Sequence, residues 1–435
     1  MINNKKDTFK KGDDFWLPLD NAAKIFPAIQ SKEMSSVIRL SVILKERIKI
    51  ANLMKAVNSI EGRFLYYKVR LKKGLFWYYL EYINFPMSLE VDNNKPCKQF
   101  NNRDKNKLML RILVKENRIS FEISHILTDG GGALEFFKSL LIIYFKIGGT
   151  RISGNINFIK PDSAILKEEF EDSYNKYFDE NIPNAVKLSK AFHLPYSINS
   201  KPRFDVLLAI ISINEIKNKA KEKGVNITNY LIALYLYILQ DVYKNLSIYS
   251  RFKKYKTLRV QVPVNLRNIY PSKSMRNFSL FVMPEIDLRL GNYTFEEIIK
   301  TVYHRMQLET DEKLVNKIIS RNVGGEKNFF IRGVPLFIKS LYLKFIYYTL
   351  GINQYSGVFT NLGKVELPKE LNELIDYFAL TAPPPHKKLK INCGVIGFND
   401  NLVLSFGNVT KSKEFEKKFL KFLVQQGIDV KITTY

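Results

Sequence analysis

Two segments in opposite halves of this 435-residue chain carry the same succession of two short apolar strands and a helix. In residues 107–141 a polar break divides the strands, and apolar and polar residues alternate along the second one. Apolar residues then recur at helical spacing. Residues 390–423 can be laid beside this segment at a constant offset, strand on strand and helix on helix. The pattern predicts two similar units of α/β structure.

The segments that precede these repeats also resemble each other, because residues 35–60 and 204–239 each predict a strand, a polar turn and a helix. A chain of this length with 46% hydrophobic residues exceeds what one core usually holds. We therefore expect an N-terminal subdomain of residues 1–182, a proline-containing linker of residues 183–203 and a C-terminal subdomain of residues 204–435. The alternative is that any two units of hairpin and helix look alike at this level.

One of only four histidines, His125, stands at the predicted end of the second strand of the first repeat, and Asp129 lies near the predicted start of the helix. A neutral imidazole, with an unperturbed pKa of about 6.5, can take a proton from an attacking alcohol, thiol or amine. The second repeat has Asn408 and Ser412 at the equivalent positions, so only one unit carries a candidate base. The glycines after Asp129 predict close approach of substrate and backbone angles closed to other residues. A half-buried histidine beside a helix-capping aspartate is the alternative interpretation.

The segment SHILTDGGG, residues 124–132, resembles the HxxxDG signature of the chloramphenicol acetyltransferase-like superfamily. That superfamily includes condensation domains, plant acyltransferases and microbial alcohol acetyltransferases. Three more landmarks follow in order. WLPLDNAAKIFPAIQ (16–30) is similar to the opening of alcohol acetyltransferase-like members, VPVNLRNIYPSKSMRNFSLF (262–281) to an arginine-and-asparagine segment, and FTNLGKVELP (359–368) to a Ser-Asn-Leu-Gly strand end.

The chain departs from the family pattern at three places. Ser124 stands where condensation domains carry a first histidine, which favours simple acyl transfer over peptide-bond condensation. The DFGWG segment of the plant enzymes is absent. Thr360 replaces the commoner serine before Asn361, and a hydroxyl is kept there.

The resemblance implies two subdomains, each a mixed and mostly antiparallel sheet with flanking helices, that form a V-shaped pseudo-dimer with a tunnel at the interface. It implies transfer of an acyl group from acyl-CoA to an alcohol or amine, with His125 as the general base. The alternatives are a carrier-protein-dependent, condensation-like acyltransferase and a noncatalytic binding protein of the same fold.

The resemblance also implies roles for the other site residues. Asp129 turns away from the histidine and forms a structural ion pair with Arg267, and Thr360 is a candidate donor to the oxyanion. The remaining residues are expected to bind substrate: Gly130, Gly131, Asn277 and Asn361.

No cofactor or metal is expected to be resident, and acyl-CoA or an acyl phosphopantetheine would be a co-substrate. His304 and His386 stand isolated, and Cys97 and Cys393 do not make a disulfide framework, so we expect a cytoplasmic protein. Its partners would be an acyl thioester, a small-molecule acceptor and, under the alternative, an acyl carrier protein. We expect a monomer, because an internal duplication lets one chain form the cleft.

The net charge of +26 would attract phosphates, yet the lysines are scattered and no nucleic-acid-binding motif accompanies them, so nucleic acid is not expected as a partner. The opening residues lack a secretory signal, and the longest apolar run, 230–239, predicts a buried helix rather than a membrane span. Residues 335–350 predict a basic, aromatic helix that flanks the core or covers an acyl-chain tunnel. Peripheral contact with an anionic membrane is the alternative for this helix.

Overall fold

The computed structural model describes residues 15–31, 34–101, 104, 107–153, 158–183, 188–200 and 204–434. The strands in chain order are β1 (Trp16–Pro18), β2 (Val37–Leu44), β3 (Val69–Lys73), β4 (Tyr78–Tyr82), β5 (Leu89–Val91), β6 (Leu110–Lys115), β7 (Arg118–Ser124), β8 (Asp205–Ser212), β9 (Thr257–Asn265), β10 (Ser279–Val282), β11 (Glu285–Asp287), β12 (Gly357–Lys364), β13 (Ile375–Thr381), β14 (Ile391–Phe398), β15 (Asn401–Asn408) and β16 (Lys431–Thr434). The α-helices are α1 (Phe26–Ile29), α2 (Ile50–Ile60), α3 (Gly130–Ile147), α4 (Ser173–Lys176), α5 (Ile213–Glu222), α6 (Ile227–Lys244), α7 (Ile248–Phe252), α8 (Phe295–Glu309), α9 (Glu312–Lys327), α10 (Phe329–Gly333), α11 (Leu336–Ile346) and α12 (Glu414–Gln425).

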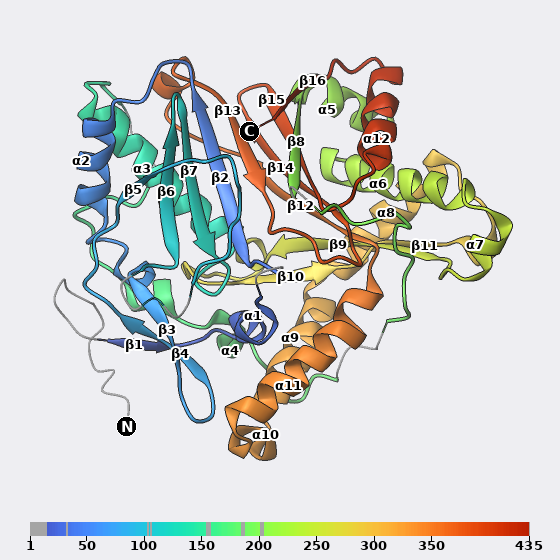
Figure 1. Cartoon of the computed structure of the whole chain (residues 1–435), viewed down its shortest axis with the longest axis horizontal. Helices are drawn as coiled ribbons and strands as arrows, with labels where there is room; N and C mark the ends of the chain where they lie inside the picture. Colours follow the sequence, from blue (N-terminus) through green and yellow to red (C-terminus); the bar gives the residue numbers. More distant parts are fainter. Residues whose placement is uncertain are drawn as a thin grey trace.

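Two large mixed sheets organise the described part of the molecule (Figure 1). The first has the order β13-β2-β7-β6-β5, and only its β5–β6 pair is parallel. The second has the order β10-β9-β12-β14-β15-β8-β16, and β12 lies parallel to both of its neighbours. A small third sheet, β1-β4-β3, flanks the first unit.

The predicted repeat is present in both sheets. The hairpin β6–β7 is followed by α3, and the hairpin β14–β15 by α12. In each unit the second strand of the hairpin pairs antiparallel with the strand that opens the unit, β7 with β2 and β15 with β8. The predicted fold, two similar units that each have a mixed and mostly antiparallel sheet with flanking helices, is therefore confirmed.

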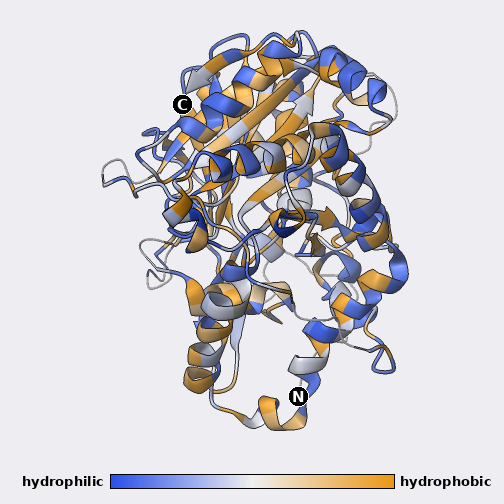
Figure 2. Ribbon diagram, turned by 90° about the vertical axis from the view of Figure 1, so that its right-hand side faces the viewer, coloured by the Kyte–Doolittle hydropathy of each residue, from blue (hydrophilic) through white to orange (hydrophobic). Residues whose placement is uncertain are grey.

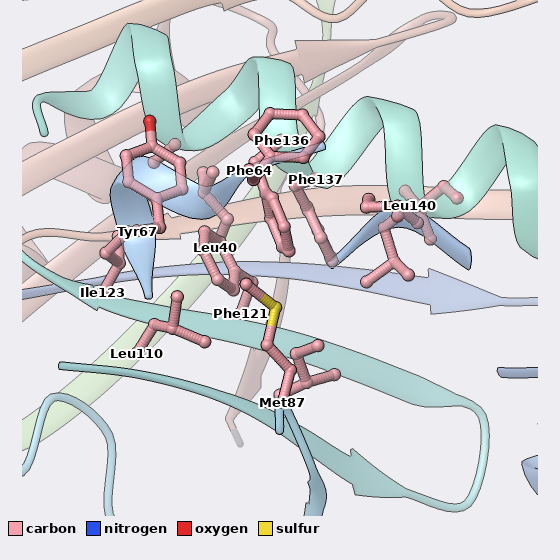
Figure 3. Packing of buried hydrophobic residues seen from close by; sticks show 14 of the residues in the cluster. Leu40, Phe64, Tyr67, Met87, Leu110, Phe121, Ile123, Phe136, Phe137 and Leu140 are labelled. Atoms are coloured by element: carbon pink, nitrogen blue, oxygen red, sulfur yellow. The ribbon is translucent and has the colours of Figure 1, made fainter. Parts of the chain in front are cut away.

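The hydrophobic core of the first unit forms where α3 crosses its sheet. Aromatic and aliphatic side chains of the helix point toward the sheet strands (Figure 3). Phe136 stacks on Phe121 of β7 with the ring centroids 4.5 Å apart. Both side chains are completely buried, so the apolar face predicted for the helix is the face that holds it on the sheet.

The C-terminal unit differs from the prediction at one point, since the helical part of residues 204–239 is broken. Ser212 caps α5 directly after β8, without an intervening turn. Gly224 then adopts a positive φ of 69°, which ends the helix, and Asn226 caps α6. The predicted buried helix at 230–239 lies within α6, and nearly all of its side chains are buried.

One strand crosses between the two halves of the chain. β13 comes from the C-terminal half and pairs with β2 at the edge of the N-terminal sheet. The predicted division into 1–182, 183–203 and 204–435 remains a prediction, and residues 1–14, 184–187 and 201–203 lie outside the described residues. Among the described residues, no helix combines the length and the apolar character that crossing a bilayer requires.

Candidate functional site

A cavity of about 1660 Å³ is lined by residues of both units. Its walls include the turn after β7 and the start of α3 on one side, and β9, β10 and β12 on the other. Helices α1, α9 and α11 contribute further lining residues. Ligand pockets commonly measure about 300–1,000 Å³, so this cavity has room for two reactants at once.

His125 lines this cavity immediately after β7 ends. Its backbone N–H donates to the carbonyl of Ser36, 2.8 Å away, which ties the turn to the residue before β2. Its half-buried ring stacks on Phe26 of α1 with 5.3 Å between the ring centroids. Strand, turn and aromatic neighbour therefore hold the imidazole in one orientation.

Asn277 determines which imidazole nitrogen carries the proton. Its Nδ2 donates to Asp20 Oδ2, 3.0 Å away, and to the carbonyl of His125, 2.9 Å away. Its Oδ1 is thereby turned toward His125 Nδ1, at a distance of 3.4 Å. Because an amide oxygen only accepts, the proton belongs on Nδ1, and Nε2 keeps its lone pair. Burial lowers the pKa of His125, which favours this neutral form.

The hydrogen bonds that hold the Asp129 carboxylate come from groups other than His125. Oδ2 accepts from Arg267 Nη1 at 2.9 Å and from the backbone N–H of Phe278 at 2.8 Å, and Oδ1 accepts from the N–H of Gly132 at 3.1 Å. Burial opposes ionisation, yet Arg267 and these N–H groups lower the pKa of the carboxyl group. Asp129 thus caps α3 and joins the two halves of the chain.

The three glycines at the start of α3 do not have the backbone angles that we expected. None of them has a positive φ, so the reason for glycine here is space. A Cβ on Gly132 would lie 2.2 Å from Thr128 Oγ1 and 2.5 Å from the carbonyl oxygen of Met275. A Cβ on Gly130 would meet only the flexible end of Leu362, and one on Gly131 would lie at least 3.3 Å from any neighbour.

The strand β12 forms the opposite wall. Thr360 lines the cavity, and its side chain has no hydrogen-bond partner within the described ranges. Asn361 is engaged elsewhere, since its Nδ2 donates to Thr228 Oγ1 at 2.9 Å and its Oδ1 accepts from the N–H of Gly363. The structure therefore brings both residues to the cavity wall, with the Asn361 amide engaged and the Thr360 hydroxyl without a partner among the described residues.

Sequence reasoning missed two residues that shape the site, Asp20 and Phe26, and it did not foresee the close packing around Gly132. Asp20 is completely buried, and besides Asn277 it contacts the N–H of Ala23 at 2.7 Å and Arg276 Nε at 3.5 Å. Burial raises its pKa to about 6. Asp20 and Phe26 both lie in the 16–30 segment, which was singled out for its resemblance and not for contact with His125.

The fold recurs in solved structures that share little sequence with this chain. Polyketide synthase associated protein 5 from Mycobacterium tuberculosis is 11% identical over 93% of this chain and 96% of its own, with a TM-score of 0.61. The TRI3 trichothecene 15-O-acetyltransferase from Fusarium sporotrichioides is 12% identical over 97% of this chain and 96% of its own, with a TM-score of 0.58. The nonribosomal peptide synthetase FmoA3 is 13% identical over 97% of this chain, with a TM-score of 0.59.

The chain has the chloramphenicol acetyltransferase-like fold. It spans only 43% of the FmoA3 chain and nearly the whole of the other two proteins. The structure of a condensation domain from the polyketide synthase MokA is similar as well, with a TM-score of 0.58 at 10% identity. No protein-family model and no curated protein sequence matches the chain.

Proposed function

We propose that this protein is an acyltransferase that moves an acyl group from a thioester of the coenzyme A type to an alcohol or amine. The observation that carries the proposal is the arrangement at His125. A neutral imidazole, protonated at Nδ1 toward Asn277, keeps the lone pair of Nε2 and lines a cavity large enough for both reactants. An acetyltransferase among the proteins of the same fold supports this reaction class.

The reaction follows from the position of the base. Nε2 of His125 takes the proton from the acceptor hydroxyl or amine as its oxygen or nitrogen attacks the thioester carbonyl carbon. The tetrahedral intermediate then collapses and the carbon–sulfur bond breaks. The departing thiolate takes from the imidazolium the proton that the acceptor gave up. No covalent acyl-enzyme is needed, and the histidine ends as it began.

The oxyanion of the intermediate needs a hydrogen-bond donor, and we assign this role to the Thr360 hydroxyl. It faces the same cavity from the opposite unit and has no competing partner among the described residues. Loss of one such donor typically costs about 3 kcal/mol of transition-state stabilisation. Gly130 and Gly131 are assigned to substrate approach, since both line the cavity.

A second pocket supports coenzyme A as the donor. It measures about 430 Å³ and has no lining residue in common with the large cavity, although residues adjacent in sequence line the two: 353, 387, 388 and 390 line the second pocket, and 354, 355, 386 and 389 line the large cavity. Five lysines line it, and none of them pairs with a carboxylate in the part of the chain that the structure describes: Lys190, Lys254, Lys387, Lys388 and Lys390.

Among the described residues no carboxylate pairs with the lysines of this pocket, although Lys388 donates to Asn353 Oδ1 and Lys390 to the carbonyl of Leu194. Burial and the neighbouring Lys254 lower the pKa of Lys390 to about 8, and His193 directs Nε2 at the carbonyls of Ile352 and Tyr355. A ligand with several phosphate groups would supply the missing negative charge. A carrier-bound donor, with its single phosphodiester, is the second candidate, which the condensation domains of the same fold support.

The test compares donors that carry and lack the nucleotide. Acyl-CoA and an acyl N-acetylcysteamine thioester would each be offered with a panel of alcohols and amines, and thiol release measured. For Lys387→Ala/Lys388→Ala we expect KM for acyl-CoA to rise at least about tenfold, because charge-assisted contacts are lost, and KM for the short thioester to stay unchanged. Lys417→Ala/Lys421→Ala, on the exposed side of α12, is the control with equal loss of charge.

Two results would contradict parts of the proposal. If both donors are turned over and the two lysine variants have equal KM values for acyl-CoA, the second pocket does not bind the donor. Turnover with acylated carrier protein alone would replace coenzyme A by the second candidate.

A further inference from the structure

An arm built from α9, α10 and α11 projects from the lower end of the molecule, and hydrophobic colours gather on it (Figures 1 and 2). The outer side chains of α10 and α11 are strongly exposed, with 83% for Phe329, 82% for Phe330 and 67% for Leu341. The turn between β3 and β4 joins this surface, since the N–H of Leu336 donates to the carbonyl of Leu75 at 2.9 Å. We call this surface the apolar arm; its large exposed side chains are Leu75, Phe76, Phe329, Phe330, Phe337, Ile338, Leu341, Tyr342 and Phe345.

The part of the apolar arm formed by α10, α11 and the β3–β4 turn carries positive charge and no carboxylate, whereas the neighbouring α9 carries Glu312 and Glu326, and Glu326 pairs with Lys24. Residues 328–349 and 72–77 contain no aspartate or glutamate, whereas Arg332, Lys339 and Lys344 lie between the apolar side chains. Lys339 is buried, and its Nζ donates to the carbonyls of Phe76 and Arg332 and lies 3.8 Å from the centroid of the Trp77 ring. Exposed aromatic residues interleaved with cations suit an anionic lipid surface.

Helix α11 also forms part of the cavity wall. Tyr342, Leu343 and Ile346 line the cavity, while Phe337 and Phe345 face outward, with 61% and 64% of their surface exposed. One helix therefore separates the outer apolar surface from the space that holds His125. The predicted role of residues 335–350, to cover an acyl-chain tunnel, concerns the inner face of α11. That role does not explain why the outer face of the helix is apolar and exposed.

We propose that the apolar arm rests on an anionic lipid membrane and that the hydrophobic reactant enters the cavity beside α11 from the lipid. Entry of the reactant from the lipid rests on the proposed acyl transfer, whereas contact between the apolar arm and the membrane does not. A second copy of the chain is a poorer occupant, because a two-fold contact would bring the lysines and arginine of the arm against their own copies with no carboxylate between them. Phospholipid headgroups supply the missing negative charge.

Vesicle flotation tests the membrane contact without any turnover. The full chain would be mixed with phosphatidylcholine vesicles that contain or lack phosphatidylglycerol. We expect binding to the anionic vesicles to weaken as salt rises. Leu341→Asp/Phe345→Asp should lower the bound fraction at least about tenfold, because two carboxylates replace inserted apolar groups. Ile248→Asp/Phe252→Asp, on the exposed surface of α7, makes the same change far from the arm and should bind as wild type does.

Three outcomes would overturn this inference: absence of wild-type binding, retention of binding by the α11 variant, or equal loss of binding in both variants. A concentration-dependent dimer in sedimentation, dissolved by the α11 variant and accompanied by no vesicle binding, would assign the surface to a second copy. Neither variant alters a cavity-lining residue, so turnover of a water-soluble acceptor should be unchanged in both. Failure of turnover would count against the proposed function and leave the vesicle result to be judged by itself.

Discussion

His125 receives its orientation from an asparagine in the other half of the chain. Asn277 can offer its oxygen to Nδ1 only because its Nδ2 is held by Asp20 and by the carbonyl of His125. The resemblance supplied Asn277 as a candidate, and its hydrogen bonds give it a physical task. Asp20 acts one step further away, because it fixes the amide and does not touch the imidazole in any of these contacts.

The pH dependence of the rate follows from the environment of His125. Burial lowers its pKa from the ordinary 6.5, so the neutral base persists at lower pH and the acid limb of kcat/KM should lie below pH 6.5. Stability should likewise fall as pH drops below 6.5, because the unfolded chain binds the proton more readily. Asp20, with its pKa raised to about 6, titrates nearby. If the acid limb of kcat/KM persists in Asp20→Asn, it belongs to His125. An acid limb of the wild-type protein at or above pH 6.5 would contradict the lowered pKa of His125.

The ion pair between Asp129 and Arg267 should matter mainly for stability. Both side chains are largely buried, and Asp129→Ala would leave the guanidinium without its carboxylate. We expect urea denaturation to report a loss of roughly 3–5 kcal/mol. The exposed pair Lys45–Glu373 provides the control, since Glu373→Ala should cost no more than about 1 kcal/mol. Equal unfolding curves for wild type and Asp129→Ala would exclude this structural role.

The start of α3 depends on one glycine more than on its two neighbours. Gly132→Ala places a methyl group against Thr128 and a backbone carbonyl, so we expect a loss of about 1–3 kcal/mol or failure to fold. Gly130→Ala meets only the movable Leu362 and should fold while it narrows the cavity. Thermal unfolding of the two variants compares them directly. The opposite order of stability would show that the close contact at Gly132 relaxes at little cost.

Secondary structure was predictable where local pattern and packing agree. The hairpin and helix around His125 appear as expected, although β7 is buried on both faces and its polar Ser120 and Glu122 lie inside with its apolar residues. The break between α5 and α6 was missed, although Gly224 and Asn226 are ordinary signals for a helix end and a helix start. The sequence on either side of Gly224 and Asn226 has a helical apolar pattern, and this pattern led to the prediction of one continuous helix.

At the scale of the whole molecule, the sheet and the core of the N-terminal unit include residues from the C-terminal half of the chain. β13 completes the N-terminal sheet, and Met275 and Phe398 of the C-terminal half belong to the N-terminal core. A fragment of residues 1–182 would leave β2 as an unpaired edge, which favours association between strands. We expect that fragment to aggregate or remain unfolded. A monomeric fragment with dispersed amide resonances in an NMR spectrum would contradict this expectation.

The same scale explains what the sequence could not reveal. Asp20 and Asn277 are 257 positions apart, and no periodicity connects a loop residue near one end to a segment beyond the middle of the chain. The pairing of Asp129 with Arg267 was available only because the resemblance pointed to both residues. The outer face of α11 could be foreseen as apolar and basic, but its exposure depends on which elements pack beside it.

The central claim is that His125 is the base for acyl transfer, and one comparison tests it most directly. Acceptor-dependent thiol release from acyl-CoA would be measured for wild type and His125→Ala, with matched thermal unfolding curves for both. We predict that the variant folds and loses about 100-fold or more of the rate, in keeping with the usual contribution of a general base. Acceptor-dependent release at the wild-type rate by a folded His125→Ala protein would contradict the claim.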